Sequence, residues 1–227
     1  MSSGTLYLVG TPIGNLADFT FRAIETLKAV RVIAAEDTRR TGLLLKKHGI
    51  ATPMVSLHEH NERQRVPELL ERLRGGEPVA LVTDAGMPVI SDPGAHLVEQ
   101  AAAAGIPVTA VPGPSAVTTA LALSGFRGER FRFEGFPPRK PKALRDWLRG
   151  IAGEDSPVVC FESPYRLVKT LEAVREVLGE VPVVVARELT KLHEEVTRGS
   201  TSDVLKRYTE RPAKGEVTLL FLPRRQS

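Results

Sequence analysis

The chain has 227 residues, which allows one large α/β domain or two compact ones. Its 42% apolar residues exclude a disordered protein, and its single cysteine, Cys160, excludes an internal disulfide and a cysteine-based zinc site. No apolar run approaches the ~18–20 residues of a membrane helix, and the N-terminus lacks a signal-like segment. We therefore expect a cytoplasmic protein that does not engage a membrane.

The net charge of +4 comes from 31 basic and 27 acidic residues and is unevenly distributed. The segment from Arg127 to Arg149 holds eight basic and three acidic residues, a net charge of +5, which leaves −1 for the rest of the chain. Such a segment is either a solvated helix face or an edge that binds a polyanion such as RNA.

Apolar runs alternate with helical patterns along the first half of the chain. Strands are expected at residues 5–10, 30–35, 54–57, 79–82 and 108–111, and helices at 18–29, 38–48, 61–74, 92–104 and 115–123. Asn61 with Gln64 predicts a capping box, and Asp92 followed by Pro93 predicts a capped helix start. Strands that are apolar on both faces and alternate with helices predict parallel βαβ units.

The pattern changes after Gly125. Strands are expected at residues 131–134, 158–161, 183–187, 194–198 and 217–222, with one helix running from Ser163-Pro164 to residue 178 and another near 202–208. We expect an N-terminal α/β domain at residues 1–115 and a C-terminal α/β domain at residues 116–227.

Two loops come close to known functional turns without matching them. In residues 9–16, Pro12 stands where the G-x-G-x-x-G motif has its second glycine, so Glu36 is not expected to bind the ribose of a nicotinamide cofactor. In residues 112–117, Val117 replaces the last glycine of a nucleophile elbow. Ser115 is therefore expected to cap its helix or touch a ligand rather than act as a nucleophile.

Polar residues follow several expected strands at the carboxyl edge of the sheet, where open α/β sheets bind ligands. Asp84, in the loop 83–94, either accepts from a ligand or organises its turn, whereas Asp92 is interpreted as a helix cap. His58 and His60 fall on one side of a strand end, but no third ligand accompanies them, so no metal is expected.

Ten motifs occur in one order across nearly the whole chain. They are Thr11-Pro12-Ile13-Gly14-Asn15-Leu16, Ala35-Glu36-Asp37-Thr38-Arg39, His58-Glu59-His60-Asn61-Glu62, Asp84-Ala85-Gly86, Ser91-Asp92-Pro93-Gly94, Pro112-Gly113-Pro114-Ser115-Ala116, Phe133-Glu134-Gly135-Phe136, Phe161-Glu162-Ser163-Pro164, Arg187-Glu188-Leu189-Thr190-Lys191 and Lys214-Gly215-Glu216. Together they resemble the tetrapyrrole methylase superfamily and, within it, the methyltransferases of small-subunit ribosomal RNA.

The resemblance implies an α/β fold of two domains, the first with a mainly parallel sheet and the second with a mixed sheet. It implies S-adenosyl-L-methionine as cofactor in the cleft between the domains, and a homodimer. The implied reaction is methyl transfer to the ribose 2′-oxygen of a cytidine in the decoding region of 16S rRNA, with either free rRNA or the small ribosomal subunit as partner.

The resemblance also implies cofactor contacts from the loop after each relevant strand. These are Val9, Gly10, Asp84, Met87, Ser115, Ala116, Phe161, Leu189 and Thr218.

A base near the 2′-hydroxyl would assist the transfer. The candidates just beyond the early strands are Asp37, which we favour, with Glu36, His58 and His60, while Arg39 would position a phosphate. In the alternative interpretation Asp37 and Arg39 only pair with each other. The basic residues expected to line the RNA path are Arg139, Lys140 and Lys142.

The sequence departs from the family pattern at three places. Met87 stands where threonine is usual and Tyr165 where histidine is common, and many relatives continue with a small helical segment where this sequence ends at Ser227. Two alternative functions remain: a superfamily methyltransferase for a small tetrapyrrole or a protein-bound residue, and a non-catalytic RNA-binding ribosome assembly factor. RNA binding would weaken steeply with salt, which separates RNA from a small substrate.

Overall fold

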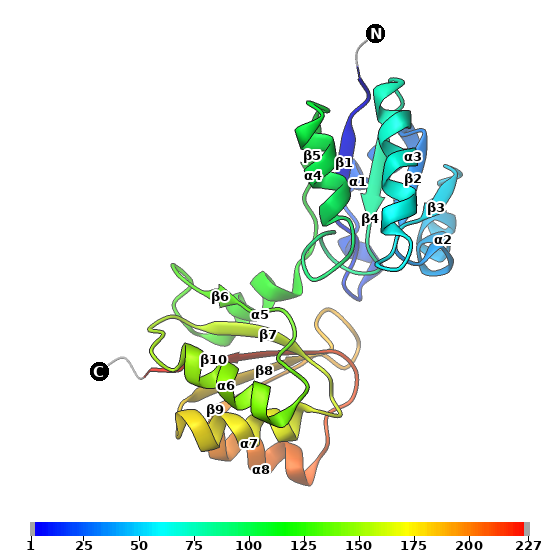
Figure 1. Cartoon of the computed structure of the whole chain (residues 1–227). Coiled ribbons are helices and arrows are strands. Elements are labelled where there is room, and N and C mark those ends of the chain that lie inside the picture. Colours follow the sequence, from blue (N-terminus) through cyan, green and yellow to red (C-terminus); the bar gives the residue numbers. More distant parts are fainter. Residues whose placement is uncertain (1–2, 225–227) are drawn as a thin grey trace. The chain divides into compact units, whose positions relative to one another are not determined.

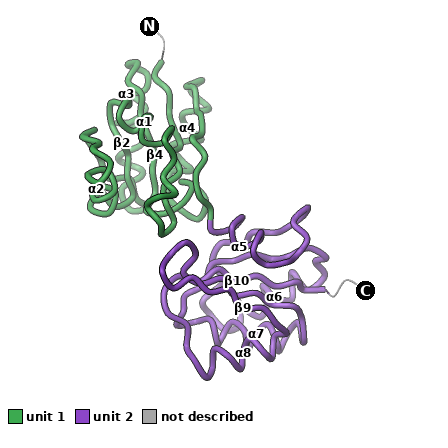
Figure 2. The backbone as a smooth tube through the Cα atoms, turned by 180° about the vertical axis from the view of Figure 1, so that it is seen from behind, with its two compact units in different colours: residues 1–115 green, residues 116–227 purple. Residues whose placement is uncertain are grey.

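The computed structural model describes residues 3–224. Figure 2 shows that the chain divides into two compact units, Met1–Ser115 and Ala116–Ser227. That each unit is an independent domain stays a prediction. Among the described residues, no helix has the length and apolar character needed to cross a membrane.

Unit 1 is built on a five-stranded parallel sheet (Figure 1). Its strands are β1 (Leu6–Val9), β2 (Val32–Ala35), β3 (Met54–Ser56), β4 (Val79–Val82) and β5 (Val108–Val111), in the order β3-β2-β4-β1-β5. Every residue of β2 and β4 is buried, as expected for parallel strands covered on both faces. The predicted parallel sheet is confirmed.

Four α-helices cover the two faces of this sheet (Figure 1). They are α1 (Phe21–Ala29), α2 (Thr38–Lys47), α3 (Glu62–Arg74) and α4 (Ala95–Ala103), and a short 3-10 helix, η1 (Leu16–Asp18), precedes α1. Helices α3 and α4 pack on one face, against side chains such as Leu6 and Leu81. Helices α1 and α2 pack on the other, against Val9 and Val82.

Unit 2 has a mixed sheet with helices on both faces. Its strands are β6 (Arg132–Phe133), β7 (Val158–Glu162), β8 (Pro182–Arg187), β9 (Glu195–Ser200) and β10 (Val217–Phe221), in the order β6-β7-β10-β8-β9. Only the β6–β7 pair is parallel. Helices α6 (Pro141–Ile151), α7 (Leu167–Leu178) and α8 (Thr201–Glu210) form a core with one face, and α5 (Ala116–Ser124) packs against the strands from the other. The predicted mixed sheet is confirmed.

Several helix starts and caps differ from the sequence prediction, and helix α1 begins at Phe21 rather than at residue 18. The α4 N-cap is Gly94, at φ 110°, where a Cβ would come within 2.4 Å of Leu81 Cδ2, so Asp92 is not the cap. The predicted capping box at Asn61 is wrong. The side-chain amide of Asn61 instead accepts a hydrogen bond from the His58 N–H and donates one to the Ser56 carbonyl. Helix α7 begins only at Leu167. At α4 the start is decided by a tertiary contact, the close approach of Gly94 to Leu81, whereas the bonds of Asn61 are to residues of its own loop.

Candidate functional site

The loops after β1 and β4 are joined at the carboxyl edge of the unit 1 sheet. Thr11 and Gly86 form an isolated antiparallel bridge, with N–H to carbonyl distances of 2.9 and 3.1 Å. The buried Thr11 hydroxyl also donates to the Thr83 carbonyl at 3.1 Å. Two irregular loops are thereby fixed to each other, as a preorganised binding site requires.

Three predicted cofactor residues, Val9, Gly10 and Met87, meet in this region. Val9 ends β1 fully buried, and the Gly10 N–H donates to the Val111 carbonyl at 3.0 Å. A Cβ on Gly10 would lie 2.7 Å from Gly113 Cα and 2.8 Å from Met87 Sδ. Only glycine allows the chain after β1 to approach the other two loops so closely.

Glu36 organises the end of β4. Its Oε2 accepts from the Thr83 hydroxyl at 2.6 Å and from the Asp84 N–H at 3.3 Å. Asp84 in turn accepts from the Asp37 N–H at 3.2 Å and from Arg40 Nη1 at 3.1 Å. The ends of β2 and β4 therefore form one hydrogen-bonded network around two carboxylates.

Asp37 and Arg39 form a local pair at the start of α2. Asp37 is the helix N-cap and accepts from the Arg39 N–H at 2.8 Å, while its carboxylate also pairs with the guanidinium at 2.7 Å. Hydrogen bonding to Arg39 holds the pKa of Asp37 well below its usual range. The Arg39 side chain is 89% exposed, so the pair lies at the surface.

Asp92 has the opposite electrostatics. Burial raises its pKa to about 6, helped by the nearby charges of Glu36 and Asp84 and opposed by a hydrogen bond with Thr83. The pKa of Asp84 is also raised, first by burial and then by Glu36, although Arg40 works against the shift. The sequence missed Asp92 as a site residue because Asp-Pro-Gly before a helix is typical of a cap.

The cluster of Glu36, Asp84 and Asp92 has three carboxylates, and the one cation that pairs with it among residues 3–224 is Arg40, which cannot balance their charge. No group in residues 3–224 has the three or more ligands that a metal ion would need. An environment of this kind favours an organic cation or a bound proton.

His58 lies in the loop after β3 at the same edge. Its Nδ1 is buried and makes no hydrogen bond within the described chain. The ring contacts His60 edge to face, with 5.9 Å between centroids. The two histidines therefore do lie together, but no hydrogen bond or ion pair among the described residues connects them to the carboxylates.

The predicted cofactor residues of unit 2 gather on one sheet face. Phe161 of β7 and Thr218 of β10 are register partners, and their side chains lie opposite the core formed by α6, α7 and α8. Helix α5, which begins at Ala116 directly after Ser115, packs against this face. Helix α5 thus covers the face that carries Phe161 and Thr218.

Leu189, the remaining predicted residue, is buried in a strained loop after β8. Its neighbours Glu188 and Thr190 have φ values of 51° and 66°. Glu188 accepts from Lys191 Nζ at 2.8 Å and from the Glu216 N–H at 2.9 Å. The motifs around Leu189 and Gly215 are thus joined through Glu188, and these hydrogen bonds hold the backbone at Leu189 in place.

The basic segment is only partly neutralised. Among the described residues, ion pairs join Arg132 to Glu134 and Glu154, Lys142 and Arg149 to Asp146, and Arg145 to Glu176. Arg139 and Lys140 are exposed and make no ion pair with a described residue. These two cations precede α6 and are available to an anionic partner.

Two exposed aromatic side chains accompany these cations, and the sequence prediction missed them. Phe136 is 62% exposed and Tyr165 is 92% exposed. Arg166 donates to the Pro137 and Pro138 carbonyls, the latter at 2.8 Å, so the turns that carry the two rings are tied together. Aromatic residues interleaved with cations are typical of single-stranded RNA binding, and that composition was the available signal.

The fold is shared with a protein of known structure. The solved uroporphyrin-III-C-methyltransferase from Thermus thermophilus is similar, with a TM-score of 0.64 at 20% identity, over 96% of this chain and 94% of that one. At this identity the likeness shows the fold alone.

The sequence comparisons show the family. The profile of the Tetrapyrrole (Corrin/Porphyrin) Methylases matches residues 5–205, so the chain belongs to this family, as its motifs predicted. A ribosomal RNA small subunit methyltransferase I from Thermotoga maritima is 50% identical over 96% of this chain and 98% of its own length. The protein of the same name from Haemophilus influenzae is 48% identical over 96% of this chain and 78% of its own length.

Proposed function

We propose that this protein transfers a methyl group from S-adenosyl-L-methionine to the ribose 2′-oxygen of a cytidine in the decoding region of 16S rRNA. The observation that carries the proposal is the match, over 96% of the chain, to relatives named as small-subunit ribosomal RNA methyltransferases. The ribose position and the cytidine come from the resemblance of the ordered motifs.

The unit 1 edge fits the charge of the cofactor. S-adenosylmethionine carries a sulfonium and an ammonium group, and Glu36, Asp84 and Asp92 offer uncompensated negative charge. The residues proposed to hold it are Val9, Gly10, Asp84, Met87, Ser115, Ala116, Phe161, Leu189 and Thr218. When bound, the cofactor supplies a methyl group made electrophilic by the positively charged sulfur.

The 2′-hydroxyl must lose its proton during the transfer, and a general base works best with a pKa near the working pH. Asp92, with its pKa at about 6, meets this requirement better than Asp37, whose pKa Arg39 keeps low. We propose Asp92 as the proton acceptor and Asp37 with Arg39 as positioning residues at the start of α2. Glu36 and His58 are the next candidates.

RNA is proposed to run along Arg139, Lys140 and Lys142. Changing the three residues together to Ala should weaken RNA binding and flatten its salt dependence by roughly 0.7 in slope per lost single-strand phosphate contact. Cofactor affinity should not change. The control changes three other exposed cations of unit 2, Lys169, Arg175 and Lys206. Equal losses in both variants would contradict a specific path.

The deciding experiment incubates the purified protein with radiolabelled cofactor and small subunits from cells that lack the gene. Label in 16S rRNA, mapped to one 2′-oxygen, supports the proposal. Label in ribosomal protein, or only in an added tetrapyrrole, supports the superfamily alternative. Salt-sensitive RNA binding without any label supports the non-catalytic assembly factor.

We also propose that the protein is a homodimer and acts in the cytoplasm, as the resemblance implies. Sedimentation velocity of the purified protein tests the first statement, and fractionation of the native cells tests the second. A single species of 24.7 kDa at micromolar concentration would contradict the dimer.

A further inference from the structure

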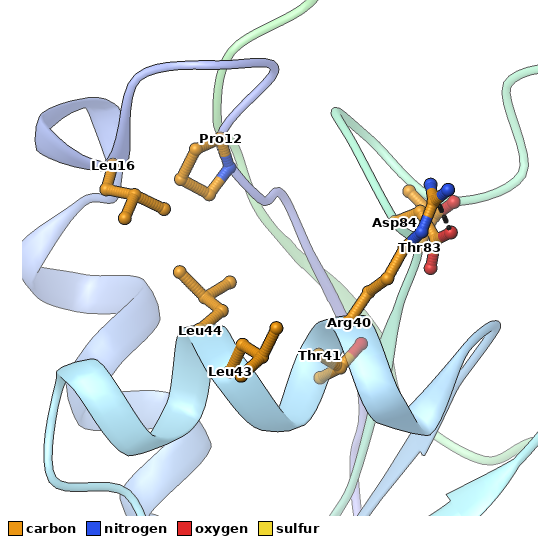
Figure 3. A pocket seen from close by; sticks show the side chains of 8 residues that line it. All are labelled: Pro12, Leu16, Arg40, Thr41, Leu43, Leu44, Thr83 and Asp84. Atoms are coloured by element: carbon orange, nitrogen blue, oxygen red, sulfur yellow. Dashed lines mark hydrogen bonds and ion pairs between the residues drawn. The ribbon is translucent and has the colours of Figure 1, made fainter.

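A pocket in unit 1 lies beside the proposed cofactor loops and shares Asp84 with them (Figure 3). It encloses about 190 Å³ and is lined by Pro12, Leu16, Arg40, Thr41, Leu43, Leu44, Thr83 and Asp84. Pockets for whole small molecules measure roughly 300–1,000 Å³, so this one suits a single ring of a larger ligand.

The walls of the pocket are apolar. Figure 3 shows Leu43 and Leu44 pointing from α2 towards Pro12 and Leu16 in the loop after β1. Leu43 is 73% exposed and Leu16 is 39% exposed, so both leave apolar surface in contact with water. A flat ring placed between them would bury this surface, which is favourable.

The rim of the pocket is polar. Arg40 reaches from α2 to Asp84, with 3.1 Å between Nη1 and Oδ2. The Asp37 N–H holds the other oxygen, Oδ1, at 3.2 Å and so fixes the carboxylate. A guanidinium has five N–H donors and a carboxylate oxygen has two acceptor sites, so both partners keep hydrogen-bonding capacity.

We propose that this pocket takes the base of the nucleotide being methylated, and that the Arg40–Asp84 pair reads its hydrogen-bonding edge. The inference rests on the proposed function. The pair offers donors beside an acceptor, which complements the N3 and O2 acceptors and the N4 amino donor of cytosine. Uracil places its O4 acceptor where the carboxylate of Asp84 needs a donor. A base can enter such a pocket only after leaving its stack, as in other enzymes that act on single nucleotides.

The test uses two preparations of the small ribosomal subunit whose 16S rRNA differs only in carrying cytidine or uridine at the methylated position. Single-turnover methylation is measured for both, and the affinity for S-adenosylhomocysteine is measured by calorimetry. Arg40→Met removes the donors and keeps the chain length, and Leu43→Asp disturbs an exposed wall residue. Lys47→Met, on the same helix and outside the pocket, is the matched control.

The unmodified protein and Lys47→Met should prefer cytidine by roughly 5–150-fold, the discrimination given by one good base contact. Arg40→Met should lose most of this preference at an unchanged S-adenosylhomocysteine affinity. Leu43→Asp should slow both substrates by at least about tenfold.

Two results would overturn the inference. The first is an unchanged cytidine preference in Arg40→Met. The second is a tenfold or greater loss of S-adenosylhomocysteine affinity in both pocket variants, which would assign the pocket to the cofactor. If the unmodified protein methylates neither RNA, the proposed function itself fails, which is a different outcome from either of these.

Discussion

The loop after β4 and the loop after β8 share a strained backbone but differ in electrostatics. Val89 and Ser91 in the first have φ values of 77° and 63°, and Glu188 and Thr190 in the second have 51° and 66°. Residues other than glycine rarely adopt a positive φ, and such backbone strain is often found at functional sites. Each unit thus has one strained loop after a strand.

The charges in the second loop are paired. Hydrogen bonding to Lys191 and to the Glu216 N–H lowers the pKa of Glu188, while Glu188 and Glu216 raise the pKa of Lys191 against the effect of burial. In the first loop, burial and like charges raise the pKa values of Asp84 and Asp92 instead.

This difference in charge pairing indicates that the two strained loops have different roles. In the loop after β8, ion pairs stabilise the unusual backbone, so its charges serve the scaffold. In the loop after β4, the carboxylates are themselves destabilised and can gain from a cation or a proton. Perturbed carboxylates of this kind mark candidate functional sites.

The largest expected effect is that of Asp92→Asn, which should reduce single-turnover methylation by roughly 10²-fold or more, the scale of general-base loss. The same change should raise stability at pH 7.5 by about 1–3 kcal/mol. The folded pKa of about 6 lies above the ordinary 3.8, so the native state binds the proton more tightly and the Asp92 contribution to stability falls as pH rises between these values.

The gain in stability should therefore vanish below about pH 4. Denaturant midpoints at pH 4 and pH 7.5 check this, with Glu99→Gln, a change at an exposed side chain, as control. A rate close to that of the unmodified protein would remove Asp92 from the proposed chemistry. A lowered midpoint at pH 7.5 would mean that its charge stabilises the fold.

A pair of glycine variants compares the packing around the two loops, at Gly86 in the loop after β4 and at Gly215, which contacts Glu188 of the loop after β8. Gly215→Ala should cost about 2–3 kcal/mol, because φ is 80° and the new Cβ would lie 2.3 Å from Cδ of the ion-paired Glu188. Gly86→Ala should cost about 1–2 kcal/mol, because φ is 88° but the nearest atom is 3.5 Å away. Urea unfolding measures the loss of stability in both variants. A larger loss in Gly86→Ala would show that the Glu188 side chain moves aside easily.

Glu188→Gln should destabilise the protein by about 1–2 kcal/mol at pH 7, after allowance for the partial exposure of the Glu188–Lys191 pair. Its folded pKa lies below the usual 4.5, so its contribution is present above that value and is lost as pH falls through the folded pKa. The variant and the unmodified protein should become equally stable in acid. At neutral pH this substitution should lower stability, whereas Asp92→Asn should raise it. A change of the same sign in both variants would contradict the proposed difference between the two loops.

The smallest effect is expected for Asp37→Asn. Asn caps helices about as well as Asp, and the partner Arg39 is 89% exposed, so the start of α2 should stay intact. Methylation should change by less than about tenfold, well below the general-base scale. A 10²-fold loss of rate with an unchanged denaturant midpoint would instead make Asp37 the base.

The sequence by itself determined the sheets, the order of the elements and the family. Apolar runs such as Val79–Val82 predicted buried strands, and glycines and prolines after them predicted irregular loops at one edge. Ordered motifs along the chain identified the tetrapyrrole methylases, and the family match confirmed them. The strands and loops follow from local composition and spacing, and the family follows from the resemblance of the motifs.

Only the tertiary structure decided which polar side chains share an environment. Asp92 resembles a cap in sequence, yet Gly94 starts α4, and Asp92 instead shares its environment with Glu36 and Asp84. Arg40 gained a role only because α2 places it beside Asp84, 44 residues further along the chain. Burial and long-range charge set these pKa values and pairings, and neither is a property of neighbouring residues in the sequence.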